Sequence, residues 1–395
     1  MPLLVLYNPV CGDGTAQQFF NEHVLPLIAS SGKVPDKIAA TDRAGHSGAI
    51  VADFLASAKS PATVVLGSGD GTLHEIINVL NSRPLGDTSI PRVSFSLVPC
   101  GTANALYSSL FPPSDDDDPL QYKLRSVRAF LSPSPTTVPL NLAITTLSPA
   151  PTRRTPLQSS ISVVVASTAL HASILHDSES LRASDPSMER FKTAALINIT
   201  LWYNATVKLF PVQTAGVVQL YDPAECKFVA HPQSTQSDPI VDLEGPFAYF
   251  LSTVNVDRLE PAFKITPLTT RTRGEVYLDV VIVRPLRDPT SAMDSEATRH
   301  AFAAKAGTVL GAAYQNGAHI ALRYAQDGSV VSDGDGPTVV EYIRCGGWEW
   351  EPDDTDNRAH LVCADGDILT IEQGGKASCL ATAPKNNNAG FAVFI

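Results

Sequence analysis

A short apolar run that stops at alternating glycines constrains this 395-residue chain more than any other feature. Residues 64–66 are apolar, glycines follow at positions 67, 69 and 71, and a helical apolar pattern comes next. This order predicts a strand, a tight turn and a helix N-terminus. Glycine lets the backbone approach a ligand closely, and the free amides of a helix N-terminus favour a phosphate. Because a carboxylate repels phosphate, we expect Asp70 to hold a metal or to accept a proton from an attacking hydroxyl.

The composition is typical of a globular protein with two or three domains. Hydrophobic residues make up 44% of the chain and charged residues 17%. The formal net charge is −11 and no basic stripe is present, so we expect no nucleic-acid partner. None of the six cysteines lie at CxxC spacing, which argues against zinc and against a redox dithiol.

Location follows from the N-terminus and from one apolar stretch. Residues 3–7 read as a first strand without a basic segment before it, so we predict no signal peptide and a cytoplasmic protein. The best candidate for a membrane span, residues 191–210, contains two lysines and two asparagines, and we reject it. Residues 196–203 remain open to two interpretations: an ordinary core helix, or a helix that covers a lipid cavity during peripheral contact with a membrane surface.

The first 130 residues alternate strand and helix, which predicts an α/β, Rossmann-like, doubly wound domain with a parallel sheet. In such sheets ligands lie at the carboxyl ends of the strands. Glycine-containing turns follow the predicted strands that end at Tyr7, Leu66 and Val98, so all three turns fall at that edge. The predicted strands are 3–7, 34–40, 63–66 and 93–98, and the predicted helices are 15–28, 47–58, 73–80 and 103–110.

Beyond residue 130 the pattern changes. Residues 131–160 read as a linker, a first strand (138–145) and a flexible loop (148–160). Residues 161–395 contain many short strand patterns and two helical stretches, 178–203 and 294–310. We therefore predict a mainly antiparallel β-sandwich domain with inserted helices.

Three motifs in the first domain carry a family resemblance. They are Asn-Pro-Val-Cys-Gly-Asp-Gly at 8–14, Gly-Ser-Gly-Asp-Gly-Thr-Leu-His-Glu at 67–75, and Pro-Cys-Gly-Thr-Ala-Asn-Ala-Leu at 99–106. In this order, each after a strand, they resemble the diacylglycerol kinase catalytic-domain superfamily, which includes the sphingosine and ceramide kinases. A lone Gly-Asp-Gly is also found in NAD kinases, so the order of the three motifs is what makes the match specific.

The resemblance implies an ATP-dependent lipid kinase that uses Mg²⁺, with metal ligands that the sequence does not identify. Asp70 would be the catalytic base. Read from the residues alone, Glu75 is equally a helix-capping partner, a ribose contact or a group that orients a neighbour, and Cys11 and Cys100 read as small turn fillers. The implied nucleotide contacts in this half are Asn8, Thr41, Ser68, Gly69, Gly71, Thr72, Glu75, Gly101, Thr102 and Asn104.

The second half adds further implied nucleotide contacts. Arg182 and Arg190 match the family's phosphate-binding arginines and would lie about two turns apart if one helix carries both. Asp365, Gly366 and Asp367 resemble the family's Asp-Gly-Glu loop; a second Asp-Gly-Asp at 333–335 competes, but apolar strand residues flank the later one. Asp13 stands where relatives often carry a cation, and Asp367 replaces Glu. These departures keep a non-catalytic lipid or nucleotide binder open as an alternative, beside an NAD kinase-like enzyme.

The lipid is the least determined point. Sphingosine carries an amine, and a buried ammonium needs a carboxylate partner. The positions where sphingosine kinases supply one are Ser173 and Leu175 here. Asp177 could still reach an amine if the helix register differs. We expect a sphingolipid-type substrate and favour a neutral acceptor such as ceramide or diacylglycerol.

Overall fold

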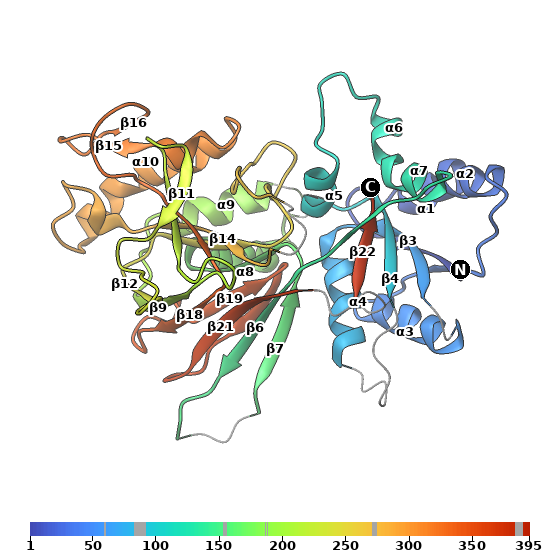
Figure 1. Ribbon diagram of the computed structural model, residues 1–395, viewed down its shortest axis with the longest axis horizontal. Coiled ribbons are helices and arrows are strands. Elements are labelled where there is room, and N and C mark those ends of the chain that lie inside the picture. Colours follow the sequence, from blue (N-terminus) through green and yellow to red (C-terminus); the bar gives the residue numbers. More distant parts are fainter. Residues whose placement is uncertain are drawn as a thin grey trace. The chain divides into compact units, whose positions relative to one another are not determined.

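The computed structural model describes residues 1–58, 61–82, 92–152, 156–185, 187, 189–270, 275–383 and 390–395. The chain forms two compact units (Figure 1). Unit 1 comprises residues 1–142, 258–261 and 383–395, and unit 2 comprises 143–257 and 262–382. Two segments of the second domain predicted over 161–395, residues 258–261 and 383–395, therefore belong to unit 1.

Unit 1 is built on a six-stranded sheet of order β2-β1-β3-β4-β22-β5. β1 (Leu3–Tyr7) pairs in parallel with β2 (Lys37–Ala40) on one side and with β3 (Ala62–Ser68) on the other, and β3 pairs in parallel with β4 (Val93–Pro99). Every residue of β1, β3 and β4 is buried, as expected for parallel strands covered on both faces. The strand order reverses beside β1, which creates the switch point where doubly wound sheets bind ligands. The predicted fold class is confirmed.

Helices cover both faces of this sheet (Figure 1). On one face, the helical segment 16–30 packs with α7 in a single apolar cluster that includes Phe20 and Val127. On the other, α3 and α4 lie so close that a Cβ on Gly48 would be 2.5 Å from Val79 Cγ2. The helices are α1 (Ala16–Phe19), a π-helical turn (Phe20–Val24), α2 (Leu25–Ser30), α3 (His46–Ala58), α4 (Asp70–Ser82), α5 (Ala105–Leu110), α6 (Pro119–Lys123) and α7 (Arg125–Leu131). The sequence analysis did not predict α6 or α7.

The C-terminal strand corrects the predicted domain boundary. β22 (Phe391–Phe394) pairs in parallel with β4, and β5 (Thr137–Pro139) pairs antiparallel with β22. The strand predicted over 138–145 is thus two strands, β5 in the first sheet and β6 (Leu142–Ser148) in unit 2. β5 ends at Pro139, Leu140 N still donates to Phe391 O at 2.9 Å, and β6 begins at Leu142.

Unit 2 contains two large antiparallel sheets, of order β11-β10-β17-β14-β13-β8-β19-β20 and β12-β9-β18-β21-β6-β7, and a two-stranded sheet of β15 and β16. Its core includes aromatic contacts between the two large sheets: Trp348 and Trp350 of β18 lie 5.4 and 5.3 Å from the Phe250 ring of β13. The predicted antiparallel domain is confirmed. Its other elements are β7 (Gln158–Ser162), β8 (Val165–Thr168), α8 (Ala169–Leu181), α9 (Glu189–Asn198), β9 (Ala205–Phe210), β10 (Gln219–Asp222), β11 (Lys227–Ala230), β12 (Val241–Glu244), β13 (Tyr249–Thr253), β14 (Leu278–Val283), α10 (Glu296–Ala313), β15 (Arg323–Tyr324), β16 (Val330–Val331), β17 (Glu341–Cys345), β18 (Gly347–Pro352), β19 (Leu361–Ala364), β20 (Asp367–Thr370) and β21 (Lys376–Thr382), with 3₁₀ turns at Pro285–Arg287 and Ala318–Ala321.

The helix predicted over 178–203 is wrong in extent. Two helices, α8 and α9, replace it, and α8 begins nine residues earlier, at Ala169. The sequence carries a proline at position 186, which disfavours one continuous helix because proline lacks an N–H and clashes with the preceding turn. After Asn198 the chain leaves the helix, so residues 199–203 are not helical.

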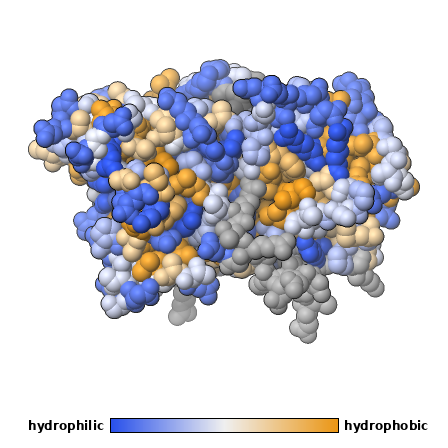
Figure 2. All heavy atoms as spheres, turned by 45° about the horizontal axis from the view of Figure 1, so that its top comes forward, coloured by the Kyte–Doolittle hydropathy of each residue, from blue (hydrophilic) through white to orange (hydrophobic). Residues whose placement is uncertain are grey.

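The apolar stretch 196–203 is split between surface and core. Leu196 and Ile197 on α9 are 74% and 54% exposed, whereas Trp202 and Tyr203 are buried. Figure 2 shows hydrophobic and hydrophilic residues interspersed over the face that it draws. Among the described residues, no helix combines the length and the apolar character that crossing a membrane requires.

Candidate active site

The three sequence motifs meet at the carboxyl edge of the unit 1 sheet. The amide of Asn8, just after β1, donates to Gly67 O of β3 at 2.9 Å, and Cys100 N, just after β4, donates to Ser68 O at 3.2 Å. The ends of three neighbouring parallel strands thus place their loops side by side, as the sequence predicts.

Two glycines make this close approach possible. A Cβ on Gly12 would lie 2.2 Å from the carbonyl oxygen of Cys100, and a Cβ on Gly101 would lie 2.2 Å from Gly69 Cα. Both contacts are with backbone, which cannot move aside as a flexible side chain can. A Cβ on Gly71 would meet no atom within 4 Å, so the start of α4 faces open space. The loops are therefore packed against one another and open on the side where a ligand would approach.

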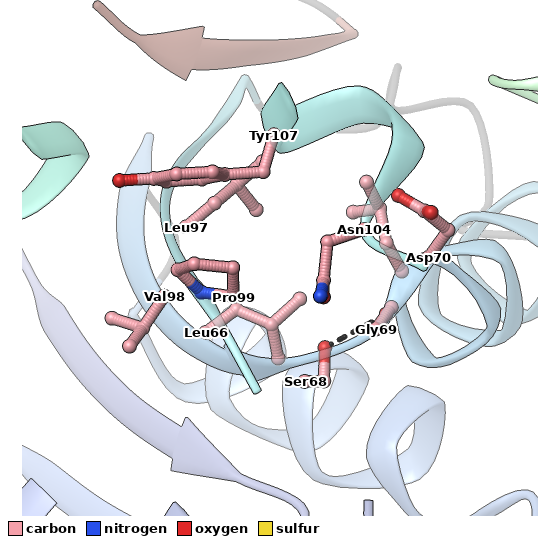
Figure 3. A pocket seen from close by; sticks show the side chains of 10 residues that line it. Leu66, Ser68, Gly69, Asp70, Leu97, Val98, Pro99, Asn104 and Tyr107 are labelled. Atoms are coloured by element: carbon pink, nitrogen blue, oxygen red, sulfur yellow. Dashed lines mark hydrogen bonds between the residues drawn. The ribbon is translucent and has the colours of Figure 1, made fainter. Parts of the chain in front are cut away.

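A small pocket lies between the second and third loops (Figure 3). Asp70 and Asn104 line it, and Tyr107 of α5 closes one side. Its floor is apolar, formed by strand residues such as Leu66 and Leu97. Sequence reasoning missed Tyr107; the signal was its position on the helix that follows the third motif.

Asp70 is the first residue of α4, and its carboxylate reaches the start of another helix. Oδ2 accepts from Ala105 N at 2.6 Å and Oδ1 accepts from Leu106 N at 3.2 Å, so Asp70 binds the first amides of α5. These bonds fix the carboxylate, which is half-buried, at the pocket wall. A fixed carboxylate open to a pocket can accept a proton from a hydroxyl placed within hydrogen-bond reach.

Glu75 orients a neighbouring segment, one of the roles left open by the sequence. Its carboxylate accepts from Gly45 N at 2.9 Å, from Ser47 N at 2.8 Å and from Gly48 N at 3.2 Å, and Ser47 Oγ also donates to it. These are the free amides at the N-terminus of α3. Thr41 lies just before that segment, nearly buried, with its amide bonded to Tyr7 O at 3.0 Å.

Asn104 and Asn8 shape the loops through their side chains. Asn104 has left-handed backbone with φ 52°, and its amide group both accepts from Gly101 N at 3.0 Å and donates to Gly101 O at 2.7 Å. Asn8 Oδ1 accepts from Val10 N at 3.1 Å. Ser68 is buried, with its hydroxyl on Gly69 O at 3.0 Å, whereas Thr102 is exposed. Thr72 is half-buried in the first turn of α4.

The first loop also contacts the third through two thiols. A hydrogen bond between the Cys11 and Cys100 side chains lowers the pKa of Cys11 and raises that of Cys100. The departure at position 13 has a local explanation: Asp13 Oδ1 accepts from Thr15 N at 3.0 Å and from Thr15 Oγ1 at 2.6 Å, which lowers the pKa of Asp13. Asp13 therefore serves the turn that leads into α1.

Arg182 and Arg190 are in unit 2 and differ in surroundings. Arg182 follows α8, is exposed, and pairs with Glu179 Oε2 at 3.0 Å. Arg190 is the second residue of α9, is buried, donates to Ser187 O at 2.8 Å, and has its guanidinium 4.4 Å from the Phe191 ring centroid. One helix does not carry both arginines, which was the condition for a spacing of two turns, because α8 ends at Leu181 and α9 begins at Glu189.

The turn at 365–367 joins β19 to β20, as the flanking apolar residues indicated. The Asp365 carboxylate accepts from the amides of Val163, Val164 and Val165 at 2.7, 2.9 and 2.7 Å. Gly366 and Asp367 are exposed, and Gly366 has φ 99°. Asp365 thus fastens its turn to the start of β8, a contact that the sequence pattern did not reveal.

Asp177 of α8, in the segment compared above with sphingosine kinases, forms an ion pair. Arg358 donates to both oxygens of Asp177, at 2.9 and 3.2 Å, and Asn198 Nδ2 donates at 2.7 Å. Burial opposes ionisation of Asp177, but the hydrogen bonds from Arg358, Asn198 and His176 outweigh it and lower the pKa of Asp177 to about 2. Ser173, one turn earlier on α8, is buried.

Comparison with known proteins agrees with the geometry of unit 1. Residues 2–129 match the family model of the diacylglycerol kinase catalytic domain. Sphingosine kinase 1 of Homo sapiens is 40% identical over 108 residues, which are 27% of this chain and 27% of that protein. Sphingoid long chain base kinase 5 of Saccharomyces cerevisiae is 30% identical over 104 residues, 26% of this chain and 15% of that protein. The matched segments thus span about a quarter or less of these relatives.

A solved structure extends the likeness to the whole fold. A diacylglycerol kinase from Bacillus anthracis str. Sterne superposes with a TM-score of 0.51, covers 96% of this chain and 94% of its own, and is 15% identical in sequence. At this identity the match speaks for the fold alone. The chain is therefore similar, at residues 2–129, to the diacylglycerol kinase catalytic domain, and over about a quarter of its length to sphingosine kinases.

Proposed function

We propose that this protein is an ATP-dependent lipid kinase that phosphorylates the primary hydroxyl of a sphingolipid-type substrate. The observation that carries the proposal is the pocket of unit 1, where Asp70 lies beside the second and third glycine loops. The family match at residues 2–129 and the relatives named as sphingosine kinases support it.

In this proposal the loop amides hold the nucleotide phosphates. The chain has no Gly-x-x-x-x-Gly-Lys-Ser/Thr sequence, so a P-loop lysine is not the device. Gly69, Gly71 and Gly101 would present amides to the phosphates, while Asn8 and Asn104 keep the loops in shape. Asp70 would accept the proton of the lipid hydroxyl as it attacks the terminal phosphate.

A magnesium ion fits this site as a companion of the nucleotide. The described residues contain no group of three or more His, Cys, Asp or Glu side chains that could hold a metal. Mg²⁺ commonly takes most of its ligands from phosphates and water, and there it neutralises charge on the transferred group. Asp70 also binds backbone amides, but unlike Asp13 and Glu75 it lines the pocket, so it is the carboxylate that would face the ion.

Unit 2 carries the remaining residues that the family resemblance assigns to the nucleotide. We propose that Arg182 and Arg190 neutralise phosphate charge, and that Gly366 and Asp367 contact the nucleotide. Asp365 would act through the turn that it holds, because its carboxylate already binds three backbone amides.

The headgroup region favours a neutral acceptor. Ser173 and Leu175 offer no carboxylate, and the Asp177 carboxylate is occupied by Arg358 and Asn198. A sphingoid ammonium would have to displace an arginine to pair with Asp177. Ceramide and diacylglycerol carry no amine, so they need no carboxylate partner.

We also propose that the enzyme reaches its lipid through peripheral contact with a membrane surface at Leu196 and Ile197, both exposed on α9. Flotation with liposomes should show reduced association for Leu196→Glu and Ile197→Glu. Met293→Glu is the matched control, because Met293 is 65% exposed elsewhere in unit 2. Unchanged flotation of the α9 variants would remove this surface from the account.

Transfer of label from γ-labelled ATP tests the function directly. Sphingosine, phytosphingosine, ceramide, diacylglycerol and NAD are offered side by side, and we expect label in the lipids, most strongly in the neutral ones. Label in NAD alone would establish an NAD kinase-like enzyme instead, and nucleotide binding without any transfer would establish a non-catalytic binder. Label in the free bases alone would overturn the argument from Asp177.

A further inference from the structure

The phosphate-binding loops of unit 1 contain no cation of their own. Residues 8–15, 67–75 and 99–104 include neither lysine nor arginine, and Asp13 adds a negative charge. Polyphosphates at a site of backbone amides are usually neutralised by a lysine, an arginine or a metal as well. A cation from elsewhere in the fold would therefore complete the site.

Lys123, the last residue of α6, lies at the first loop. Its ammonium is 5.3 Å from the ring centroid of Phe19, on the helix that directly follows this loop. Phe19 and Cys11 pack against the same apolar cluster, which contains Cys100, and Leu120 of α6 packs there too. The short helix α6 is thus fastened beside the first and third loops.

The electrostatics agree with this placement. The pKa of Asp13 is lowered chiefly by its hydrogen bonds with Thr15 and further by the charge of Lys123. The Lys123 charge also favours the thiolate at Cys11 and at Cys100, although the hydrogen bond between the two thiols has the larger effect on each. The charge of the Lys123 ammonium therefore reaches Cys11 and Asp13 of the first loop and Cys100 at the start of the third loop.

Three other cations of unit 1 have different partners. Arg43 pairs with Asp42 at 3.0 Å, and Arg125 pairs with Asp117 and lies over the Tyr122 ring. Lys33 lies over the Phe130 ring at 5.4 Å. Lys123 is half-buried, and its long side chain leaves the ammonium able to turn toward a ligand on the loops.

We propose that Lys123 is the cation that neutralises the nucleotide phosphates at the first glycine loop. It would supply from α6 the positive charge that the loop lacks because Asp13 occupies the position of a cation. This inference rests on the proposed nucleotide site. Lys123 would be a phosphate-binding residue supplied by α6, outside the three motifs.

Titration of the wild type, Lys123→Met and Lys123→Arg with ATP and with adenosine tests this. Charge-assisted hydrogen bonds are strong, so we expect Lys123→Met to weaken ATP binding about tenfold or more, and to change adenosine binding less than about twofold. Lys123→Arg should recover most of the ATP affinity. Lys33→Met is the matched control, because it removes a lysine from a phenylalanine ring away from the loops, and it should leave both affinities unchanged.

The outcomes separate this inference from the proposed function. ATP affinity unchanged in Lys123→Met, or an equal loss for ATP and adenosine, would overturn the role of Lys123 while leaving the kinase proposal in place. A wild type that binds ATP no better than adenosine would overturn the phosphate site, and the role of Lys123 with it. Melting temperatures of the variants identify a misfolded protein, and Lys123→Arg then decides the question, because ATP affinity lost with arginine in place would contradict a charge role.

Discussion

Two aspartate–glycine turns, one in each unit, look alike in sequence and differ in structure. Asp70 opens α4 and binds two amides of α5, while its carboxylate also lines a pocket. Asp365 lies in a β-turn with φ 50° and binds three consecutive amides, those of the two residues before β8 and of its first residue. Both carboxylates hold backbone together, but Asp70 alone of the two lines the described pocket. The comparison teaches that both aspartates hold backbone in place, and that Asp70 differs by lining a pocket, which is why it is the candidate base of the proposed function.

The largest expected effect is on the rate of Asp70→Asn. Removing a general base typically lowers a rate by about 10²–10⁴-fold, and we expect lipid phosphorylation to fall by that factor. Asparagine keeps one acceptor for the α5 amides, so the fold should persist. Labelled-ATP transfer and circular dichroism on the same sample measure both. Near-normal phosphorylation would reduce Asp70 to a clamp like Asp365.

Gly101→Ala tests whether the loops must touch. The new Cβ would lie 2.2 Å from Gly69 Cα, and neither loop can yield without backbone movement. We expect ATP affinity to fall about tenfold or more, with a loss of about 1–3 kcal/mol in stability from overpacking. Gly311→Ala on α10 is the control, because its Cβ meets nothing within 4 Å and it lies outside the proposed nucleotide site. Equal effects of the two substitutions on ATP affinity would contradict the importance of this contact.

Asp365→Asn should act on stability. The side-chain amide cannot accept all three backbone hydrogen bonds, and each buried amide left unsatisfied costs about 1–3 kcal/mol. Denaturant unfolding should show a loss of that size, while the rate per folded molecule changes less than about tenfold. Asp367→Asn, on the exposed side of the same turn, should leave stability within about 0.5 kcal/mol. An unchanged free energy of unfolding in Asp365→Asn would contradict the stabilising role of the Asp365 hydrogen bonds.

The smallest expected effect depends on pH and concerns a third aspartate. The pKa of Asp177 is about 2 in the folded protein, below its ordinary value of 3.8, so its ion pair adds stability above about pH 4 that is lost as the pH falls from 4 to 2. Asp177→Asn should cost about 1–2 kcal/mol at pH 7. This difference from wild type should vanish near pH 2, as followed by urea unfolding at several pH values. A difference independent of pH would mean that packing, not charge, fixes this site.

The N-terminal half of the fold could be predicted because its signals are local. Glycine turns after buried runs identified β1, β3 and β4 and the edge where the motifs meet. The partner of β22 could not be predicted, because residues 391–394 pair with residues 93–95 across almost 300 positions of the chain. The helix pair α8 and α9 was misread as one helix over 178–203, because its apolar pattern continues into buried Trp202 and Tyr203.

The candidate site divides in the same way. The identities of Asp70, Gly69 and Gly101 follow from chemistry at a strand end. The backbone contacts of Glu75 and Asp365 could not be predicted, because each binds amides outside its own motif. Lys123 lies outside every motif, on the five-residue helix α6, which was not predicted from the sequence.

The most direct test of the account is a structure of the protein bound to a non-hydrolysable ATP analogue with Mg²⁺. The account predicts phosphates against the amides of residues 12–14, 69–72 and 101–102, with Asp70 facing the terminal phosphate. A nucleotide bound away from the unit 1 pocket, or phosphates turned away from these loops, would contradict it.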